Sequence, residues 1–194
     1  MDISLYLGIF AGIVQISAFA FYNRNVFRGT AKPNTATWSL WFFLTILNAA
    51  SYVAITGDFA KYFLPIASAG ATAATFAYAL FAGKFSGIDR WDSLAFALGI
   101  LAMLVWWYYQ SAIYANLIVL NAIAISFWPT YRGVWKNPTT EEALPWYLWA
   151  FAYALSTATV LLRWSGSFFE LVLPVSLFFL HLAVGPLTRR KRSI

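Results

Sequence analysis

Cysteine is absent from this chain, and charged residues are scarce. Without cysteine, the chain forms no disulfides and has no thiolate nucleophiles or Cys-based metal sites. Charged residues make up 10% of the sequence and hydrophobic residues 61%, whereas a soluble domain has roughly 25% charged residues. Several apolar runs reach about 20 residues, the length that crosses a bilayer. The composition excludes a soluble fold and predicts an all-α integral membrane protein.

Apolar segments predict seven transmembrane helices, over residues 3–22, 37–55, 62–82, 93–109, 112–131, 145–162 and 168–187. Each segment is bounded by Gly, Pro, Asn or charged residues. The sequence has none of the short alternating strands that a β-barrel requires. The start of the chain, MDISLYLG, has no basic region, so we expect the first apolar run to remain as a helix instead of being cleaved as a signal peptide.

Basic residues predict the orientation in the membrane. With seven spans, 11 of the 13 Lys and Arg residues fall on one side, and only Lys61 and Arg163 fall on the other. The positive-inside rule makes the first side cytoplasmic, so the N-terminus is expected outside and the C-terminus inside, in a cell or inner membrane. The basic tail, 188–194, is expected to lie near anionic lipid headgroups and not to bind nucleic acid.

Motifs of the first three predicted helices recur in the last three. FRGTAK at 27–32 and YRGVWK at 131–136 both read aromatic-Arg-Gly-x-x-Lys, and Trp-x-Leu-Trp follows at 38–41 and 146–149. Pro65 and Pro174 lie 24 and 25 residues after the second Trp of each motif. This predicts a three-helix repeat over 1–82, a linker helix within 83–111 and a second repeat over 112–187. Because the linker adds one crossing, the two repeats are parallel, related by an axis along the membrane normal.

This 3+1+3 arrangement, with parallel repeats and an outside N-terminus, resembles the SWEET sugar transporters and the wider PQ-loop superfamily, which includes the bacterial nicotinamide riboside transporters. The resemblance covers nearly the whole chain at the level of architecture. The family carries a proline toward the end of the first helix of each repeat. Here Pro129 fills that place in 112–131, whereas 3–22 has no proline. The resemblance implies a facilitative transporter that works by alternating access, with Trp and Asn side chains around a central cavity.

Two aromatic and polar stripes are the candidate substrate site. Trp38, Trp41, Thr45 and Asn48 lie on one helical face, and Trp146, Trp149, Tyr153 and Ser156 repeat the same spacing. The substrate-binding candidates are Trp41, Thr45, Asn48, Trp149, Tyr153, Ser156, Asn116, Asn121 and His181, and Thr72 and Thr75 are further cavity candidates. Indole faces with amide and hydroxyl groups suit a small neutral solute such as a sugar, nucleoside or vitamin.

Packing accounts for part of the same pattern. Trp38 and Trp146 lie in the first turn of their helices and are expected to be interfacial anchors. An interhelical hydrogen bond would explain Asn48. His181 is the only histidine. As an intramembrane titratable group it is a functional candidate, and a neutral histidine bonded to a neighbouring helix is the alternative.

Hinges and gates have their own candidates. Pro65, Pro129 and Pro174 are the hinge candidates, and Glu170 with Arg163 forms either an outer gate pair or ordinary interfacial charges. No acidic residue falls in the middle of a predicted span, which favours a uniporter. Nucleophile, base and metal ligands are nearly missing, so neither an enzyme nor a cofactor is expected.

A second hypothesis stays open beside transport. A seven-helix receptor or lipid-binding protein would hold a small ligand without moving it. The expected partners are a small solute and the lipid bilayer, and the sequence leaves a homo-oligomer open.

Overall fold

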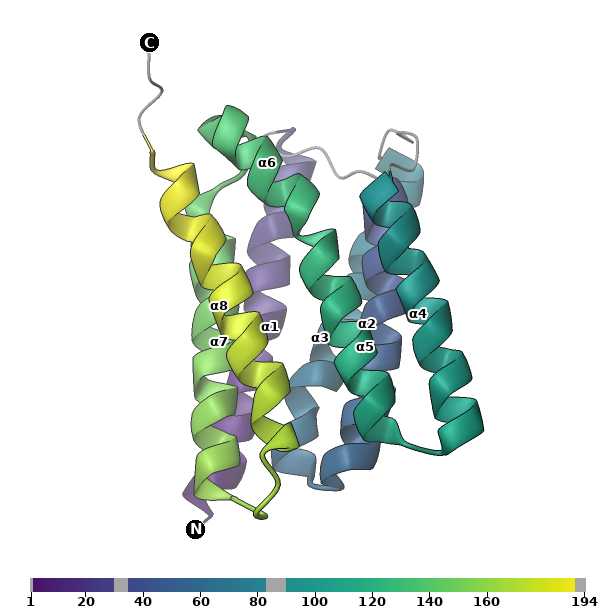
Figure 1. The fold of residues 1–194 in the computed structure, drawn as a ribbon. Helices are drawn as coiled ribbons and strands as arrows, with labels where there is room; N and C mark the ends of the chain where they lie inside the picture. Colours follow the sequence, from purple (N-terminus) through teal and green to yellow (C-terminus); the bar gives the residue numbers. More distant parts are fainter. Residues whose placement is uncertain (1, 30–34, 83–89, 191–194) are drawn as a thin grey trace.

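The computed structural model describes residues 2–29, 35–82 and 90–190, which form a bundle of long helices (Figure 1). The helices are α1 (Ile3–Phe27), α2 (Thr35–Thr56), α3 (Phe59–Ala82), α4 (Arg90–Tyr109), α5 (Ala112–Ser126), α6 (Trp128–Lys136), α7 (Ala143–Leu162) and α8 (Phe169–Thr188), with a 3-10 turn, η1 (Pro138–Thr140), before α7. No strand occurs in these ranges. The prediction of an all-α fold is confirmed.

Six helical segments of the described chain are long and apolar enough to cross a membrane, with α5 and α6 together forming one of them, Ala112–Lys136. The remaining helix, α7, is 20 residues long and lies within the bundle. Its tryptophans, tyrosines, serine and threonines lower its hydropathy. The structure therefore supports a membrane-embedded bundle, and the count of seven spans stays a prediction.

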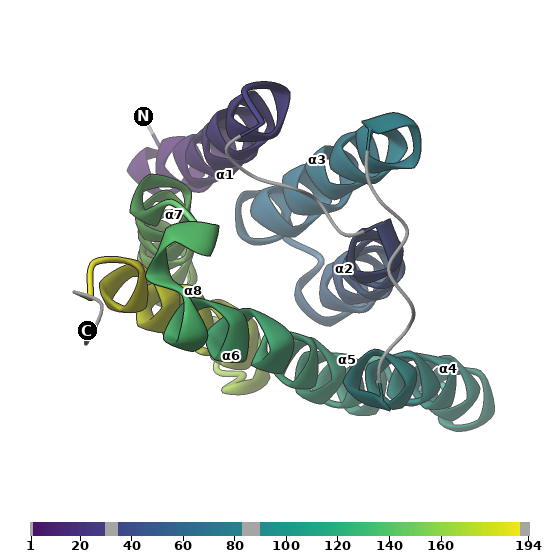
Figure 2. The same cartoon turned by 90° about the horizontal axis from the view of Figure 1, so that it is seen from above.

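The helices form a ring around a central axis when the bundle is seen from above (Figure 2). On one side of the ring α3 packs against both α1 and α2, and on the other side α8 packs against α7 and against α5 and α6. Two further contacts close the ring, α1 against α7 and α2 against α5, while α4 lies outside against α5 and α2. The centre of the ring is thus bordered by α1, α2, α3, α5, α7 and α8.

Proline marks a break in the fifth predicted span. Phe127 separates α5 from α6, and Pro129 lies in the first turn of α6, where a missing backbone N–H is tolerated. The span therefore continues beyond its predicted end at residue 131, to Lys136. Pro65 and Pro174 lie inside α3 and α8.

Glycine allows α1 and α3 to approach closely. A Cβ atom on Gly8 would lie 2.2 Å from the carbonyl oxygen of Ala60. Such small-residue contacts are how helices pack tightly in a bilayer, where lipid supplies no hydrophobic drive for association.

The two ends of the bundle differ in charge. One end, here called the ion-pair end, holds the start of α1, the α2–α3 and α7–α8 connections, and the residues Asp2, Asp58, Lys61, Arg163 and Glu170. The opposite end, the basic end, holds the last turn of α1, α6 and the end of α8, with Arg24, Arg28, Arg132, Lys136, Arg189 and Arg190.

Candidate functional site

A cavity lies at mid-height in the centre of the ring. It is lined by Gln15, Phe19, Trp41, Leu44, Thr45, Asn48, Ser68, Thr72, Ile123, Phe127, Trp149, Tyr153, Leu177 and His181. The volume that the centres of water molecules can occupy in this cavity is about 40 Å³. One water requires roughly 10–15 Å³ on the same measure. The cavity therefore has room for a few waters, and a ring-shaped solute requires it to widen. Among these described lining residues none is Lys, Arg, Asp or Glu.

Six of the nine sequence candidates border this one cavity. They come from three helices: Trp41, Thr45 and Asn48 from α2, Trp149 and Tyr153 from α7, and His181 from α8. The stripes therefore face each other across the centre of the bundle. Thr72 lies beside them, whereas Thr75 packs between α3 and α1, where its hydroxyl accepts from Asn23.

The two cavity tryptophans keep unpaired donors. Neither Trp41 Nε1 nor Trp149 Nε1 has a hydrogen-bond partner among the described residues, and both atoms are buried. A buried N–H without a partner costs roughly 1–3 kcal/mol, so native proteins rarely retain one without a role. The arrangement offers two indole donors, one from each half of the chain, to a molecule in the cavity.

Asn48 is part of a hydrogen-bonded cluster between α2 and α5. Asn116 Nδ2 donates to Asn48 Oδ1 at 3.1 Å and to Ser51 Oγ at 2.8 Å. The Ser51 hydroxyl donates to the Asn48 carbonyl, so its oxygen is free to accept from Asn116. Asn116 is itself absent from the cavity wall. The structure thus gives Asn116 the role of positioning Asn48.

His181 lies in an aromatic environment. Its ring stacks on Tyr153 with centroids 5.3 Å apart and also contacts Phe127, Trp146 and Trp149. Nδ1 lies 2.7 Å from the Leu177 carbonyl. A carbonyl only accepts, so Nδ1 carries the proton and Nε2 of the neutral ring is an acceptor. The bond is within α8, so the interhelical bond expected for a structural histidine is not what holds this ring.

Aromatic side chains form a layer between the cavity and the basic end. Trp38 contacts Trp41 at 5.2 Å and Tyr22 at 5.2 Å, and Trp146 contacts Trp149 at 5.0 Å. Trp38 and Trp146 are 4% and 2% exposed. The expectation that these two tryptophans are interfacial anchors is therefore wrong. They occupy the predicted height, but they point into the bundle, and we call them, with Phe19 and Tyr22, the aromatic layer.

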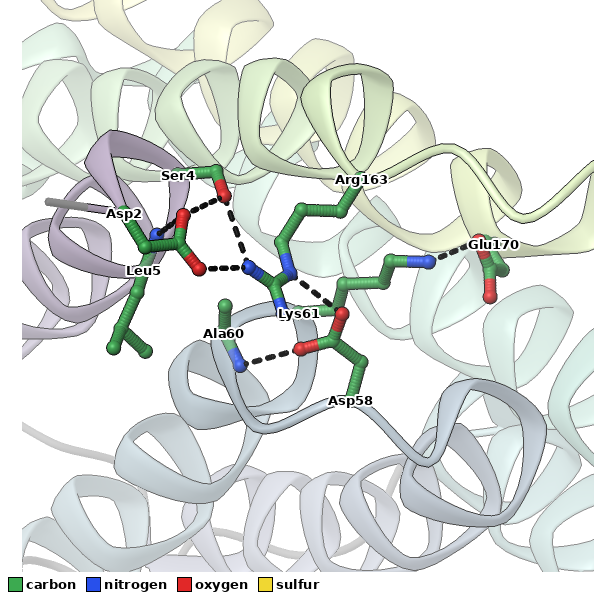
Figure 3. Close-up of polar contacts among 8 residues, drawn as sticks. All are labelled: Asp2, Ser4, Leu5, Asp58, Ala60, Lys61, Arg163 and Glu170. Atoms are coloured by element: carbon green, nitrogen blue, oxygen red, sulfur yellow. Dashed lines mark hydrogen bonds and ion pairs between the residues drawn. The ribbon is translucent and has the colours of Figure 1, made fainter.

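A buried ion pair lies at the opposite end of the bundle from the aromatic layer. Lys61 Nζ lies 2.7 Å from Glu170 Oε2, and the two side chains are 3% and 2% exposed (Figure 3). The hydroxyl of Tyr52 donates to the Glu170 carbonyl at 2.6 Å. Lys61 lies in the first turn of α3 and Glu170 in the first turn of α8, so the pair joins the two sides of the ring.

Arg163 adds a second, more exposed connection at this end. Its Nε donates to Asp58 Oδ2 at 2.6 Å and its Nη1 to Asp2 Oδ2 at 2.5 Å (Figure 3). Hydrogen bonds from the Ser4 hydroxyl, the Arg163 guanidinium and the Leu5 amide lower the pKa of Asp2 to about 2. The sequence left Arg163 and Glu170 as either a gate pair or ordinary interfacial charges, and they do not pair with each other. Instead each pairs with residues of the first half, because their side chains point across the ring.

Three sequence candidates lie away from the cavity. Asn121 is exposed on the outer face of α5, where Nδ2 donates to the Leu117 carbonyl, so the prediction that it faces the cavity is wrong. Ser156 is buried one turn beyond Tyr153 but is not part of the lining. Asn116 lies behind Asn48, as described above. Pro65, Pro129 and Pro174 also lie outside the lining, and their role as hinges stays a prediction.

Several residues of the site were missed from the sequence. Gln15 and Ser68 line the cavity, and Lys61 and Asp58 hold the ion-pair end. The sequence could have predicted Gln15, because it is an amide in the middle of an apolar span, where polar groups face protein or water. The internal repeat could have pointed to Lys61, because it lies four residues before Pro65, as Glu170 lies four residues before Pro174.

Two neighbouring carboxylates at the basic end accept hydrogen bonds, and one of them connects the two sides of the ring. Glu142 accepts from Asn25 Nδ2 of α1 at 2.8 Å, and Glu141 accepts from Trp146 Nε1 at 3.2 Å. Burial raises the pKa of Glu141 to about 7, with Glu142 adding to the shift and the Trp146 bond opposing it. The Glu141–Trp146 bond at the start of α7 is therefore sensitive to pH near neutrality.

Comparison of the chain with protein-family models, with curated proteins and with solved structures found no match.

Proposed function

We propose that the chain is a facilitative membrane transporter for a small neutral polar solute. It works by alternating access between two parallel three-helix halves, residues 1–82 and 112–187, with α4 as their linker. In this proposal α7 is the seventh span. The positive-inside rule places the basic end in the cytoplasm and the ion-pair end outside.

The observation that carries the proposal is the placement of the cavity between two closures. Toward the ion-pair end, Lys61 and Glu170 join the two sides of the ring. Toward the basic end, Phe19 and Tyr22 of the aromatic layer contact Trp149 of the other half. A cavity that can open to one side at a time requires a removable closure on each side, and both closures here are made by contacts between the halves.

The helix packing supports the internal repeat. In each half the third helix lies beside both others, α3 beside α1 and α2, and α8 beside α7 and the α5–α6 span. The contact of α1 with α7 corresponds to that of α5 with α2 under exchange of the halves. The same exchange brings Trp41 onto Trp149 and Thr45 onto Tyr153, all of which line the cavity.

The chemistry of the cavity favours a neutral solute. A charged solute would require an opposite charge in the cavity wall, because an unpaired charge in low dielectric is costly. The described lining residues include no Lys, Arg, Asp or Glu. The two free indole N–H groups instead suit hydroxyl or carbonyl oxygens on a ring that the aromatic faces can stack against.

The test combines binding with flux. Thermal unfolding of the purified protein is measured against neutral sugars, nucleosides and vitamins, and any stabilising compound is then tested for uptake into proteoliposomes. A solute present at about 100 times its dissociation constant should add roughly 2.7 kcal/mol. We expect the Trp41→Phe/Trp149→Phe variant to lose most of that gain, because it keeps the rings and removes the donors.

The matched control is Trp107→Phe, which alters an indole that is 77% exposed on α4. It should bind and transport as the unaltered protein does. Binding without uptake would instead favour the receptor hypothesis, and failure of every neutral solute to bind would contradict both.

A further inference from the structure

Polar side chains between α1 and α3 repeat one arrangement twice. Gln15 Nε2 donates to Ser68 Oγ at 3.0 Å, and Asn23 Nδ2 donates to Thr75 Oγ1 at 3.1 Å. Ser68 and Thr75 lie about two turns apart along α3, and Gln15 and Asn23 are separated by about 12 Å along α1. In both cases the amide NH₂ group donates the hydrogen bond, and the amide carbonyl oxygen accepts none.

Neither carbonyl oxygen has a partner among the described residues. Gln15 Oε1 and Asn23 Oδ1 are both buried and unpaired, and the Gln15 side chain lines the cavity. The orientation of Asn23 follows from its neighbour. Thr75 donates its hydroxyl proton to the Ala71 carbonyl at 3.0 Å, so its oxygen can only accept from Asn23, and the Asn23 oxygen must point elsewhere.

The second half of the chain has no counterpart. Alignment of the halves on their Arg-Gly motifs and their prolines sets Gln15 opposite Val119, Asn23 opposite Phe127, Ser68 opposite Leu177 and Thr75 opposite Val184. All four counterparts are apolar. At these four positions the α1–α3 interface is therefore polar and its α5–α8 counterpart apolar.

We propose that the carbonyl oxygens of Gln15 and Asn23 form a hydrogen-bond acceptor track that binds the donor edge of the solute and orients it. Gln15 supplies the acceptor in the cavity, and Asn23 supplies the next acceptor toward the basic end. This inference rests on the proposed transport function and adds which wall selects the solute and which groups the solute must carry.

The track defines a class of solute. A fitting molecule carries hydroxyl or N–H donors along one edge and a less polar face opposite, which packs against Phe127 and Leu177. A solute with hydroxyls all around its ring would leave some of them unpaired against the apolar wall. A solute without donors would leave the Gln15 oxygen unpaired, and sites built to hydrogen-bond a group reject analogues that lack it.

The experiment uses three related probes. Phenyl β-D-glucopyranoside has one apolar face and one hydroxyl edge, D-glucose has hydroxyls all around, and the tetra-O-methyl derivative of the phenyl glucoside has no donors. Equilibrium binding is measured with the purified full chain, for the unaltered protein, Gln15→Met and Asn121→Leu. Asn121 is the matched control, because it is a membrane-level amide on the outer face of the bundle.

We expect the phenyl glucoside to bind at least tenfold more tightly than either other probe. Gln15→Met should weaken its binding about three- to tenfold, the value of one neutral hydrogen bond, and should reduce the preference over the methylated probe. Asn121→Leu should change neither. Loss of preference is the decisive readout, because a purely structural role for Gln15 would weaken all probes alike.

Asn23→Leu supplies an independent test if Gln15→Met does not fold. It should slow release toward the basic end by a similar factor and leave equilibrium binding in the cavity unchanged. Equal binding of hydroxylated and methylated probes, or an unchanged preference in Gln15→Met, would overturn the acceptor track and leave the transporter proposal standing. If no neutral solute binds the unaltered protein, the proposed function fails, and the track fails with it.

Discussion

Lys61 and Glu170 form a buried ion pair, with 2.7 Å between Nζ and Oε2, and each lies four residues before a proline inside its helix, Pro65 or Pro174. Positions related by a two-fold axis meet each other only on that axis. The pair therefore marks the place at the ion-pair end where the axis between the proposed halves leaves the bundle.

Exchange of the two charges tests this relationship. Lys61→Met or Glu170→Gln alone should destabilise the protein by about 3–5 kcal/mol or strongly lower expression, because the partner is left as an unpaired buried charge. Lys61→Glu/Glu170→Lys should recover most of that loss, since the axis gives both positions similar surroundings. Thermal unfolding in detergent measures the difference. A double variant as unstable as the sum of the single ones would contradict the placement on an axis.

Glu141 should make the stability depend on pH near neutrality. Its pKa rises from an ordinary 4.5 to about 7 in the folded chain. The folded state therefore binds this proton more tightly than the unfolded state does. The contribution to stability is fully present below pH 4.5 and is lost as the pH rises through about 7. Glu141 retains partial exposure, so we expect a loss on the order of 1 kcal/mol.

The measurement for Glu141 is the unfolding temperature between about pH 4 and about 8, a range that includes both the ordinary pKa of 4.5 and the folded-state pKa of about 7. Glu141→Gln should flatten the profile. Glu142→Gln, at an exposed neighbour, should reduce the slope only slightly, because burial raises the pKa of Glu141 more than the charge of Glu142 does. An identical slope in the Glu141 variant would show that another group titrates in this range.

Asn48 and Asn116 should be energetically coupled. Leucine at either position leaves the other amide buried without its hydrogen-bond partner. Leucine at both positions removes both amides, so no buried polar group is left unpaired. We expect each single variant to lose about 1–2 kcal/mol and the double variant to lose clearly less than the sum. A double-mutant cycle on unfolding free energies measures the coupling. Strict additivity would mean that the two amides act separately and that Asn116 does not position Asn48.

Apolar spacing was enough to predict where the helices lie. Each of the seven predicted segments corresponds to a helix, or in one case to the α5–α6 pair, because hydrophobic length and flanking polar residues decide where a chain can cross a bilayer. The ends were less predictable. Residues 128–136 continue as α6 because proline in a first turn begins a helix as readily as it ends one.

Helical spacing alone could have separated Asn116 from Asn121. Five residues apart, they are about 140° apart around a helix and cannot both face the centre. The structure puts Asn116 inside and Asn121 outside. Trp38 and Trp146 are a harder case, since the same position in a helix serves an interfacial ring and a buried one. Only the neighbouring helices decide which way such a ring points.

Long-range pairing was the part that the sequence left open. Arg163 and Glu170 are near each other along the chain, so the sequence allowed either a pair between them or ordinary interfacial charges. In the folded protein Arg163 reaches Asp2 and Asp58, and Glu170 reaches Lys61. Such contacts depend on how distant helices are arranged, and only the internal repeat carried information about that arrangement.

Opening of the ion-pair end is the central requirement of the transport account, and the absence of cysteine permits a direct test. Asp58→Cys/Arg163→Cys places thiols on side chains that now contact each other. A short, reducible bifunctional cross-linker would hold the two halves together there. Uptake of a bound neutral solute into proteoliposomes is measured before cross-linking, after it, and after reduction, with each single-cysteine variant as control. The account predicts uptake that is lost on cross-linking and restored by reduction. Undiminished uptake in the cross-linked protein would contradict it.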